Sequence, residues 1–131
     1  MSESIFTKLI KGEIPSFKIA EDDKFIAFLD IMPLKRAHTL VVPKVQIDYI
    51  YDLPDKMLSD LMIFSKKVAK KIESKIECKR IGVAVIGLEV PHAHVHLIPI
   101  NDIRDMDFSQ PKLSLTNLEM QEIADLINQI A

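Results

Sequence analysis

Three of the four histidines in this chain stand at every second position of one short segment, as His92, His94 and His96. Because side chains alternate between the faces of an extended strand, this spacing predicts that the three imidazoles share one face. The apolar residues between and after them are expected to face the core: Ala93, Val95 and Leu97. Imidazole suits proton transfer, metal ligation and nucleophilic attack near neutral pH. We therefore interpret the segment as a functional site rather than as an exposed strand that happens to be rich in histidine.

Metal binding is a second chemistry that this spacing allows. His-x-His pairs on strands also bind zinc or iron, and His38 supplies a possible fourth ligand. No nearby Asp or Glu completes a familiar ligand set. We therefore expect neither a metal nor a cofactor, with a histidine-based metal site as the alternative.

Composition predicts one globular domain over residues 1–131. Hydrophobic residues make up 48% of the chain, and 17 basic against 19 acidic side chains leave a formal charge of −2. A charge so close to zero gives no general attraction to nucleic acid or to anionic membranes. Five lysines between Lys66 and Lys75 are interpreted as the solvated side of a helix, not as a nucleic-acid site.

The chain shows no secretory signal and no apolar run of the roughly 20 residues that would cross a bilayer. Cys78 is the single cysteine, so the fold does not depend on an intramolecular disulfide. We interpret Cys78 as structural or incidental rather than as a catalytic thiol. A cytoplasmic protein is expected.

Hydrophobic periodicity predicts several short strands. Residues 17–21 and 25–29 form a hairpin in this interpretation, and residues 38–42 form a third strand. Residues 80–86 come next and should pair antiparallel with the histidine strand, because only a short loop separates the two.

Three segments have helical patterns: a short one over residues 4–12, a long one over 54–77, and a last one that begins at a capping box, Thr116 to Glu119. The apolar stripe expected on the long helix comprises Leu58, Leu61, Met62, Ser65, Val68, Ala69, Ile72 and Ile76. That of the last helix comprises Leu118, Ile123, Leu126, Ile127 and Ile130. The fold class is α+β: an antiparallel sheet of about five strands with helices against one face.

At residues 92–98 the sequence resembles the histidine triad (HIT) family, whose signature is His-φ-His-φ-His-φ-φ with φ hydrophobic. Residues 5–15, 28–33 and 38–44 resemble further blocks of the family in the same order, so that the likeness covers roughly residues 4–100. The resemblance implies a HIT-like fold, a homodimer, and a hydrolase or transferase that cleaves a phosphorus bond beside a nucleoside monophosphate.

The resemblance also implies roles for the histidines. His94 attacks the α-phosphate and forms a nucleotidyl-histidine, which water then cleaves. His96 hydrogen-bonds the phosphate or the departing group, and His92 and His38 form a supporting pair. An imidazole with an ordinary pKa of about 6.5 is mostly neutral at cell pH and can attack phosphorus. Imidazole bonded to phosphorus is also a good leaving group.

Nucleotide-binding residues follow from the same resemblance. Asp30 binds the ribose hydroxyls, which donate to a carboxylate. The base pocket is lined by Phe6, Ile14, Phe28 and Ile31, and the loop with Gly87 and Glu89 lies at the phosphate. The implied substrates are purine nucleotide conjugates of adenosine type: phosphoramidates, nucleotidyl-sulfates or dinucleoside polyphosphates.

The chain departs from the family pattern in two places. Ser4 and Thr7 stand where many relatives have a Cys-x-x-Cys zinc motif, and Gln46 where a histidine is common, so we expect no structural zinc. Leu88 and Glu89 replace polar residues of the phosphate loop, where a carboxylate would repel the substrate. A nucleotide-binding module with weak catalysis is therefore a further alternative.

Overall fold

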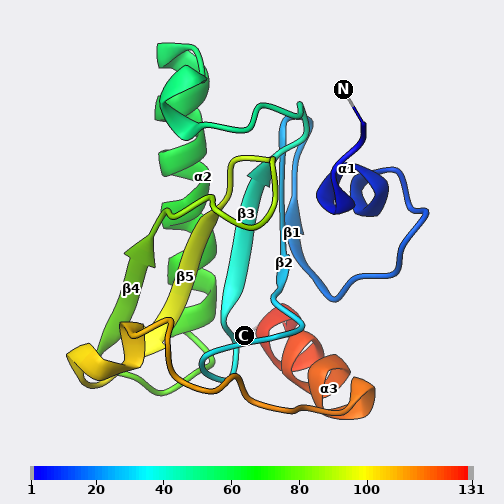
Figure 1. The fold of residues 1–131 in the computed structure, drawn as a ribbon. Coiled ribbons are helices and arrows are strands. Elements are labelled where there is room, and N and C mark those ends of the chain that lie inside the picture. Colours follow the sequence, from blue (N-terminus) through cyan, green and yellow to red (C-terminus); the bar gives the residue numbers. More distant parts are fainter. Residues whose placement is uncertain (1, 130–131) are drawn as a thin grey trace.

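A five-stranded antiparallel sheet forms the centre of the computed structural model, which describes residues 2–129 (Figure 1). The strand order is β1-β2-β3-β5-β4, and each neighbouring pair is antiparallel. The strands are β1 (Lys18–Glu21), β2 (Phe25–Leu29), β3 (Thr39–Pro43), β4 (Arg80–Ala84) and β5 (Val95–Ile100). The expected hairpin and the expected pairing of the histidine segment with the strand before it are confirmed.

Three α-helices accompany the sheet: α1 (Ile5–Ile10), α2 (Asp55–Glu73) and α3 (Asn117–Asn128). Two 3-10 turns, η1 (Ile50–Asp52) and η2 (Ile103–Met106), lie in the connections. The α+β class is confirmed. The capping box of α3 is present, since Thr116 and Glu119 each bond the other's backbone N–H. Ile130, expected on the apolar side of α3, lies outside the described residues.

Helices pack on both faces of the sheet, not on one as the sequence pattern suggested. The core on one face joins the sheet to α2 and α3, whereas a smaller cluster on the other joins it to Phe6 of α1. All five residues of β2 are buried, because Ile26 and Phe28 face α1 while their neighbours face the larger core. A continuous apolar run is typical of a strand covered on both faces.

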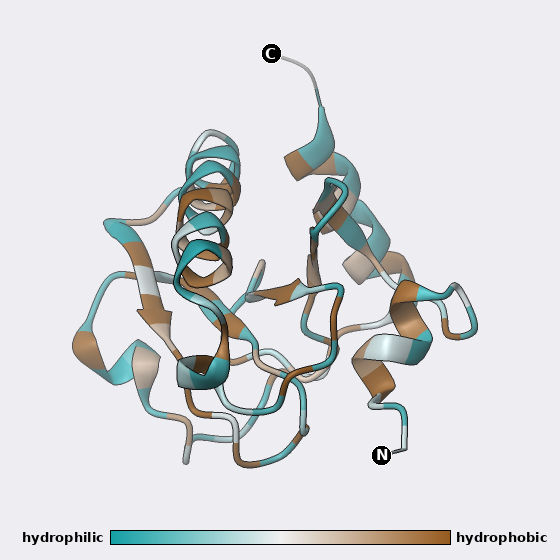
Figure 2. Ribbon diagram, turned by 90° about the horizontal axis from the view of Figure 1, so that it is seen from above, coloured by the Kyte–Doolittle hydropathy of each residue, from teal (hydrophilic) through white to brown (hydrophobic). Residues whose placement is uncertain are grey.

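The expected apolar stripe of α2 is present except at Met62, and Phe64, which was not expected on it, is part of the core. Phe64 is buried, with its ring centroid 5.6 Å from that of Phe25, whereas Met62 is 43% exposed. On α3, Leu118 is 69% exposed, so its place in the stripe was wrong. Teal and brown residues alternate along both helices in Figure 2, as on helices with one wet and one buried side. No helix within residues 2–129 is long and apolar enough to cross a membrane.

Candidate active site

A cavity of about 470 Å³ opens on the α1 side of the sheet. Its walls come from α1, β2, the loop after β2, the loop between β4 and β5, and the segment after η2. Ten of the eleven residues proposed from the sequence line it: Phe6, Ile14, Phe28, Asp30, Ile31, His38, Gly87, Glu89, His94 and His96. His92 is the exception. The structure therefore brings the proposed site residues together, apart from one histidine.

The histidine segment is only partly a strand, because β5 begins at Val95. Just before it, the Ala93 N–H donates to the carbonyl of Ile47, outside the sheet ladder. The alternation continues in one respect, since Ala93, Val95 and Leu97 lie in the larger core as expected. The imidazoles diverge, however: His94 and His96 line the cavity with ring centroids 5.0 Å apart, and the His92 ring lies away from it.

The backbone fixes the tautomer of His94. Its Nδ1 lies 2.7 Å from the carbonyl oxygen of His92, which can only accept, so Nδ1–H donates. In the neutral ring the lone pair is therefore on Nε2. A nucleophilic nitrogen is thus available in the cavity without any rearrangement of protons.

A series of hydrogen bonds links the Leu34 N–H, His38 and His96. The Leu34 N–H donates to His38 Nδ1 at 3.0 Å, so the proton of the neutral His38 ring is on Nε2. That nitrogen lies 2.9 Å from His96 Nδ1 and donates to it, which leaves the proton of His96 on Nε2. The expected pairing of His38 with His92 is wrong, because the partner of His38 is His96.

The turn before β3 places His38 in this series of hydrogen bonds. Ala37 has φ +70°, in the left-handed region that residues with a Cβ rarely adopt. The carbonyl of His38 accepts from the Asp30 N–H at 2.9 Å, which ties the turn to the end of β2. Backbone strain of this kind is common beside functional side chains.

Both members of the His38–His96 pair are neutral at physiological pH. Burial, reinforced by repulsion from His96 when that ring is protonated, lowers the pKa of His38 to about 3. Burial likewise lowers the pKa of His96 to about 4, with His94 as the next cause. Protonation of His38 would also place an N–H against the Leu34 N–H. The pair therefore acts as a neutral relay that presents the His96 Nε2–H as a donor.

The same shifts make stability depend on pH. Below about pH 6.5 the unfolded chain takes up protons at His38 and His96 that the folded chain does not bind until pH 3 to 4. The free energy of unfolding should therefore fall by at least about 2 kcal/mol between pH 7 and pH 4.5. Urea unfolding at the two pH values measures this loss. A double variant with asparagine at both positions should show a smaller loss, and an equal loss would contradict the assignment.

The described residues contain one group of three possible metal ligands, Asp30, His38 and His96. Asp30 Oδ2 lies 3.6 Å from His38 Nε2, so a carboxylate that is remote in sequence adjoins the histidines. The group does not fit a metal, because His38 Nε2 carries a proton as long as the Leu34 N–H occupies Nδ1. A metal would have to displace that proton and break the bond to His96.

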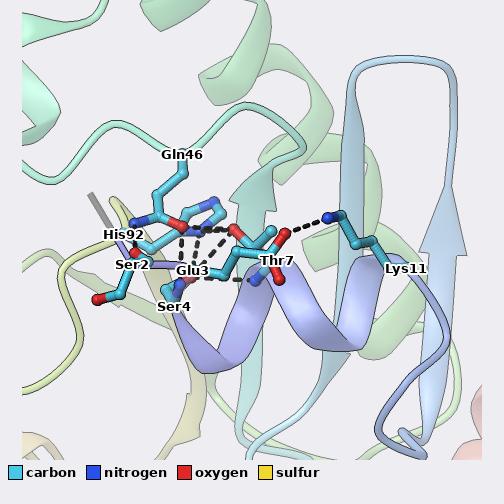
Figure 3. A network of polar contacts seen from close by, with 7 residues as sticks. All are labelled: Ser2, Glu3, Ser4, Thr7, Lys11, Gln46 and His92. Atoms are coloured by element: carbon cyan, nitrogen blue, oxygen red, sulfur yellow. Dashed lines mark hydrogen bonds and ion pairs between the residues drawn. The ribbon is translucent and has the colours of Figure 1, made fainter.

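His92 belongs to a polar network with the N-terminus of α1 (Figure 3). Its Nε2 donates to the Pro43 carbonyl at 2.7 Å, so its Nδ1 accepts from Ser4 Oγ at 2.8 Å. Ser4 also caps α1 by accepting from the Thr7 N–H, and Thr7 Oγ1 donates to Gln46 Oε1. Hydroxyl and amide groups here occupy the positions of the family's zinc ligands, and their donor set does not fit zinc.

Loss of the Ser4 hydroxyl should destabilise the fold. Ser4→Ala leaves His92 Nδ1 and the Thr7 N–H without this partner in a buried place. We expect a loss of about 1 to 3 kcal/mol in the free energy of unfolding, measured with urea. Ser74→Ala is the control, because Ser74 Oγ bonds a backbone carbonyl at an exposed helix end. Equal effects of the two substitutions would show that the network is not stabilising.

Asp30 faces the cavity from the loop after β2. Its Oδ1 accepts from the Met32 N–H at 2.9 Å, which fixes the carboxylate. Burial raises the pKa of Asp30, against the effect of that bond, and Glu89 raises it further. Glu89 and Leu88 are exposed at the cavity rim, as is Ile31, which is 68% exposed. A rim position allows the Glu89 carboxylate to remain in water beside the site.

Phe108 and Lys112 are among the cavity-lining residues that the sequence interpretation did not name. The Phe108 ring centroid lies 4.9 Å from that of His96 and 6.3 Å from that of His38. Both residues come from an irregular segment after η2, beyond the part that resembles the family. No motif or periodicity marks them, so no sequence signal could have identified them.

Fold and cavity together define an α+β protein with an imidazole-lined binding site. A model of the HIT domain matches residues 11–103 of the chain. The protein therefore belongs to the histidine triad family.

Similar proteins come from distant organisms. An adenosine 5'-monophosphoramidase of Saccharomyces cerevisiae is 42% identical over 100 residues, which are 75% of this chain and 63% of the yeast protein. The chain thus spans less than two thirds of that relative's length. A HIT-like protein of Borreliella burgdorferi is 36% identical over 100% of this chain and 98% of its own. A solved Hit-like protein of Bartonella henselae superposes with a TM-score of 0.83 at 32% identity, over 95% of this chain and 93% of its own.

Proposed function

We propose that the protein is a nucleotide hydrolase or transferase that cleaves a phosphorus bond at the α-phosphate of an adenosine-type nucleotide conjugate. The observation that carries the proposal is the bond from His94 Nδ1–H to the His92 carbonyl, which leaves the Nε2 lone pair available in the cavity. The similarity to an adenosine 5'-monophosphoramidase supports the substrate class.

The reaction has two displacements at phosphorus. First, the His94 Nε2 lone pair forms a bond to the α-phosphorus, and the bond to the leaving group breaks with its electron pair. A phosphoramidate nitrogen leaves as an amine after taking a proton from solvent. Second, water attacks the phosphorus, the Nε2–P bond breaks, and a proton passes to solvent. The intermediate is an imidazolium whose Nδ1–H still bonds the His92 carbonyl, which stabilises its charge.

The His38–His96 pair and the loop between β4 and β5 supply hydrogen-bond donors for the phosphoryl oxygens. The His96 Nε2–H is a donor held by His38, so it requires little reorganisation when charge develops. Backbone N–H groups near Gly87, which has φ +76°, are the further donors that the loop offers. Two sets of fixed donors beside the nucleophile favour the transition state over the ground state.

The nucleoside lies against the apolar end of the cavity in this proposal. Phe6 and Phe28 pack edge to face with centroids 5.4 Å apart, and Ile14 lines the same wall. Asp30 then accepts from the ribose hydroxyls. A cavity of about 470 Å³ is in the ordinary size range for small-molecule sites.

Turnover of adenosine 5'-phosphoramidate by the purified protein tests the proposal, with release of AMP as the readout. Calorimetry with AMP, done in parallel, distinguishes the proposed enzyme from the main alternative, a nucleotide-binding module. Tight binding of AMP without release of AMP from the phosphoramidate would identify a nucleotide-binding module that lacks catalysis. If the protein neither binds AMP nor cleaves the phosphoramidate, both the hydrolase and the nucleotide-binding module are ruled out.

The Asp30 carboxylate should account for a preference for ribose. Asp30→Asn keeps an oxygen for the Met32 N–H but turns an acceptor-only group into a partial donor. We expect the wild type to prefer the ribose substrate over its 2'-deoxy analogue by about tenfold in kcat/KM, and the variant to lose most of that preference. Equal preferences in the two proteins would remove Asp30 from the ribose site.

A homodimer is part of the proposal. Strand β4 is an edge strand of the sheet, and Val83 on it is 52% exposed. Val85, just after the strand, is 41% exposed. Exposed apolar residues along an unpaired edge favour association with a second copy. Light scattering measures the molar mass of the purified protein in solution, and a monomer at micromolar concentration would contradict the proposed homodimer.

A further inference from the structure

Aromatic and imidazole rings form a continuous row along the cavity. Successive centroids are 5.4 Å apart from Phe28 to Phe6, 5.1 Å from Phe6 to His94, 5.0 Å from His94 to His96, and 4.9 Å from His96 to Phe108. The proposed nucleophile stands in the middle of this row. The apolar wall proposed for the nucleoside is at one end, and Phe108 is at the other.

Lys112 lies at the Phe108 end, and the Asp30 and Asp107 carboxylates attract its charge only from beyond ion-pair distance. Its Nζ donates to the Phe108 carbonyl at 2.7 Å and lies 6.0 Å from the centroid of the Phe108 ring. A second, longer contact joins it to the Gln110 carbonyl at 3.4 Å. Among residues 2–129, no acidic side chain forms an ion pair with Lys112, although it lines the cavity. Its positive charge also disfavours protonation of His38 and His96.

The segment that carries Lys112 is held in place before any ligand binds. The Leu113 N–H donates to the Pro33 carbonyl at 2.8 Å, which ties the segment to the loop after Asp30. The Asp107 carboxylate accepts from the Ser109 backbone N–H and from its hydroxyl. An ammonium group held at a cavity wall is preorganised to bind an anion.

We propose that Phe108 and Lys112 form the leaving-group part of the substrate site, in which the Lys112 ammonium binds a negatively charged leaving group. Substrates of this class carry a carboxylate or phosphate beyond the bond that breaks, as in phosphoramidates of acidic amines. This inference rests on the proposed function and adds to it the charge of the departing group. The segment lies beyond residues 11–103, the part that matches the HIT domain.

Two adenosine phosphoramidates of equal size test the inference: one made from β-alanine and one from β-alaninamide. They share the amine and the chain length and differ in one negative charge. We expect wild-type protein to prefer the β-alanine conjugate by roughly five- to tenfold in kcat/KM, as for a half-buried ion pair. Added salt should reduce this preference, because it screens the pair.

Variants of Lys112 separate charge from structure. Lys112→Gln should lose most of the preference, Lys112→Glu should reverse it, and Lys112→Arg should keep it. Lys66→Gln is the matched control, since Lys66 is exposed on α2, on the other face of the sheet. If Lys112→Gln prefers the β-alanine conjugate as strongly as the wild type does, the inference is overturned. It is also overturned if the wild type cleaves both conjugates without preferring either. If the wild type cleaves neither, the proposed function itself fails.

Discussion

Replacing His94 with alanine is expected to lower kcat on adenosine 5'-phosphoramidate by about 10⁴-fold or more. The substitution removes the nitrogen that bonds to phosphorus, and removal of a nucleophile that acts as part of a unit has effects of this size in other enzymes. Activity that remains would come from positioning and from donors such as the His96 Nε2–H. Steady-state release of AMP, with single-turnover rates for the slow variant, measures the effect.

His94→Asn is the control for shape and hydrogen bonding. Its side-chain amide can still donate to the His92 carbonyl, as Nδ1–H does, but it offers no nucleophilic ring nitrogen. Both variants should bind AMP, because the nucleoside wall and Asp30 are unchanged. Turnover within tenfold of the wild type in either variant would show that His94 is not the nucleophile.

His96→Asn should lower kcat by about 10² to 10³-fold with a smaller change in KM. Asparagine Oδ1 can accept from His38 Nε2–H in place of His96 Nδ1, so the hydrogen bond that His38 donates is retained. The variant lacks the Nε2–H that we assign to the phosphoryl oxygens. Loss of one preorganised donor typically has an effect of this magnitude on kcat.

His96→Gln has the opposite effect: its amide nitrogen reaches the position of Nε2 and donates there, while its bond to His38 is weaker. This variant should retain more activity than His96→Asn despite the weaker bond to His38. Comparison of kcat and KM for the two variants therefore separates the donor from the relay. If asparagine supports more turnover than glutamine, the donor role of His96 is wrong.

Elements with a strong local pattern could be predicted from the sequence. The apolar run of β2 and the capping box at Thr116 depend on residues close together in the chain, and the structure has both. The cavity residues drawn from the family resemblance also came together, apart from His92. The stripe of α2 was predicted apart from Met62 and Phe64, and the burial of Phe64 depends on Phe25 in a distant strand.

Histidine partners could not be predicted, because they are set by contacts between distant segments. His38 and His96 are 58 positions apart, and their bond depends on the left-handed backbone at Ala37. The His92 ring turns to Ser4, 88 positions away, rather than to the cavity. Tautomers follow from backbone groups such as the Leu34 N–H, which only the folded chain places.

Mass spectrometry of the trapped intermediate tests the central assignment most directly. Protein mixed with adenosine 5'-phosphoramidate and denatured within milliseconds at alkaline pH should carry AMP on the tryptic peptide 81–104, which contains three histidines. Fragmentation should place the adduct on His94, and His94→Ala should carry none. An adduct on His92 or His96, or steady turnover by a wild type that never carries AMP, would contradict the account.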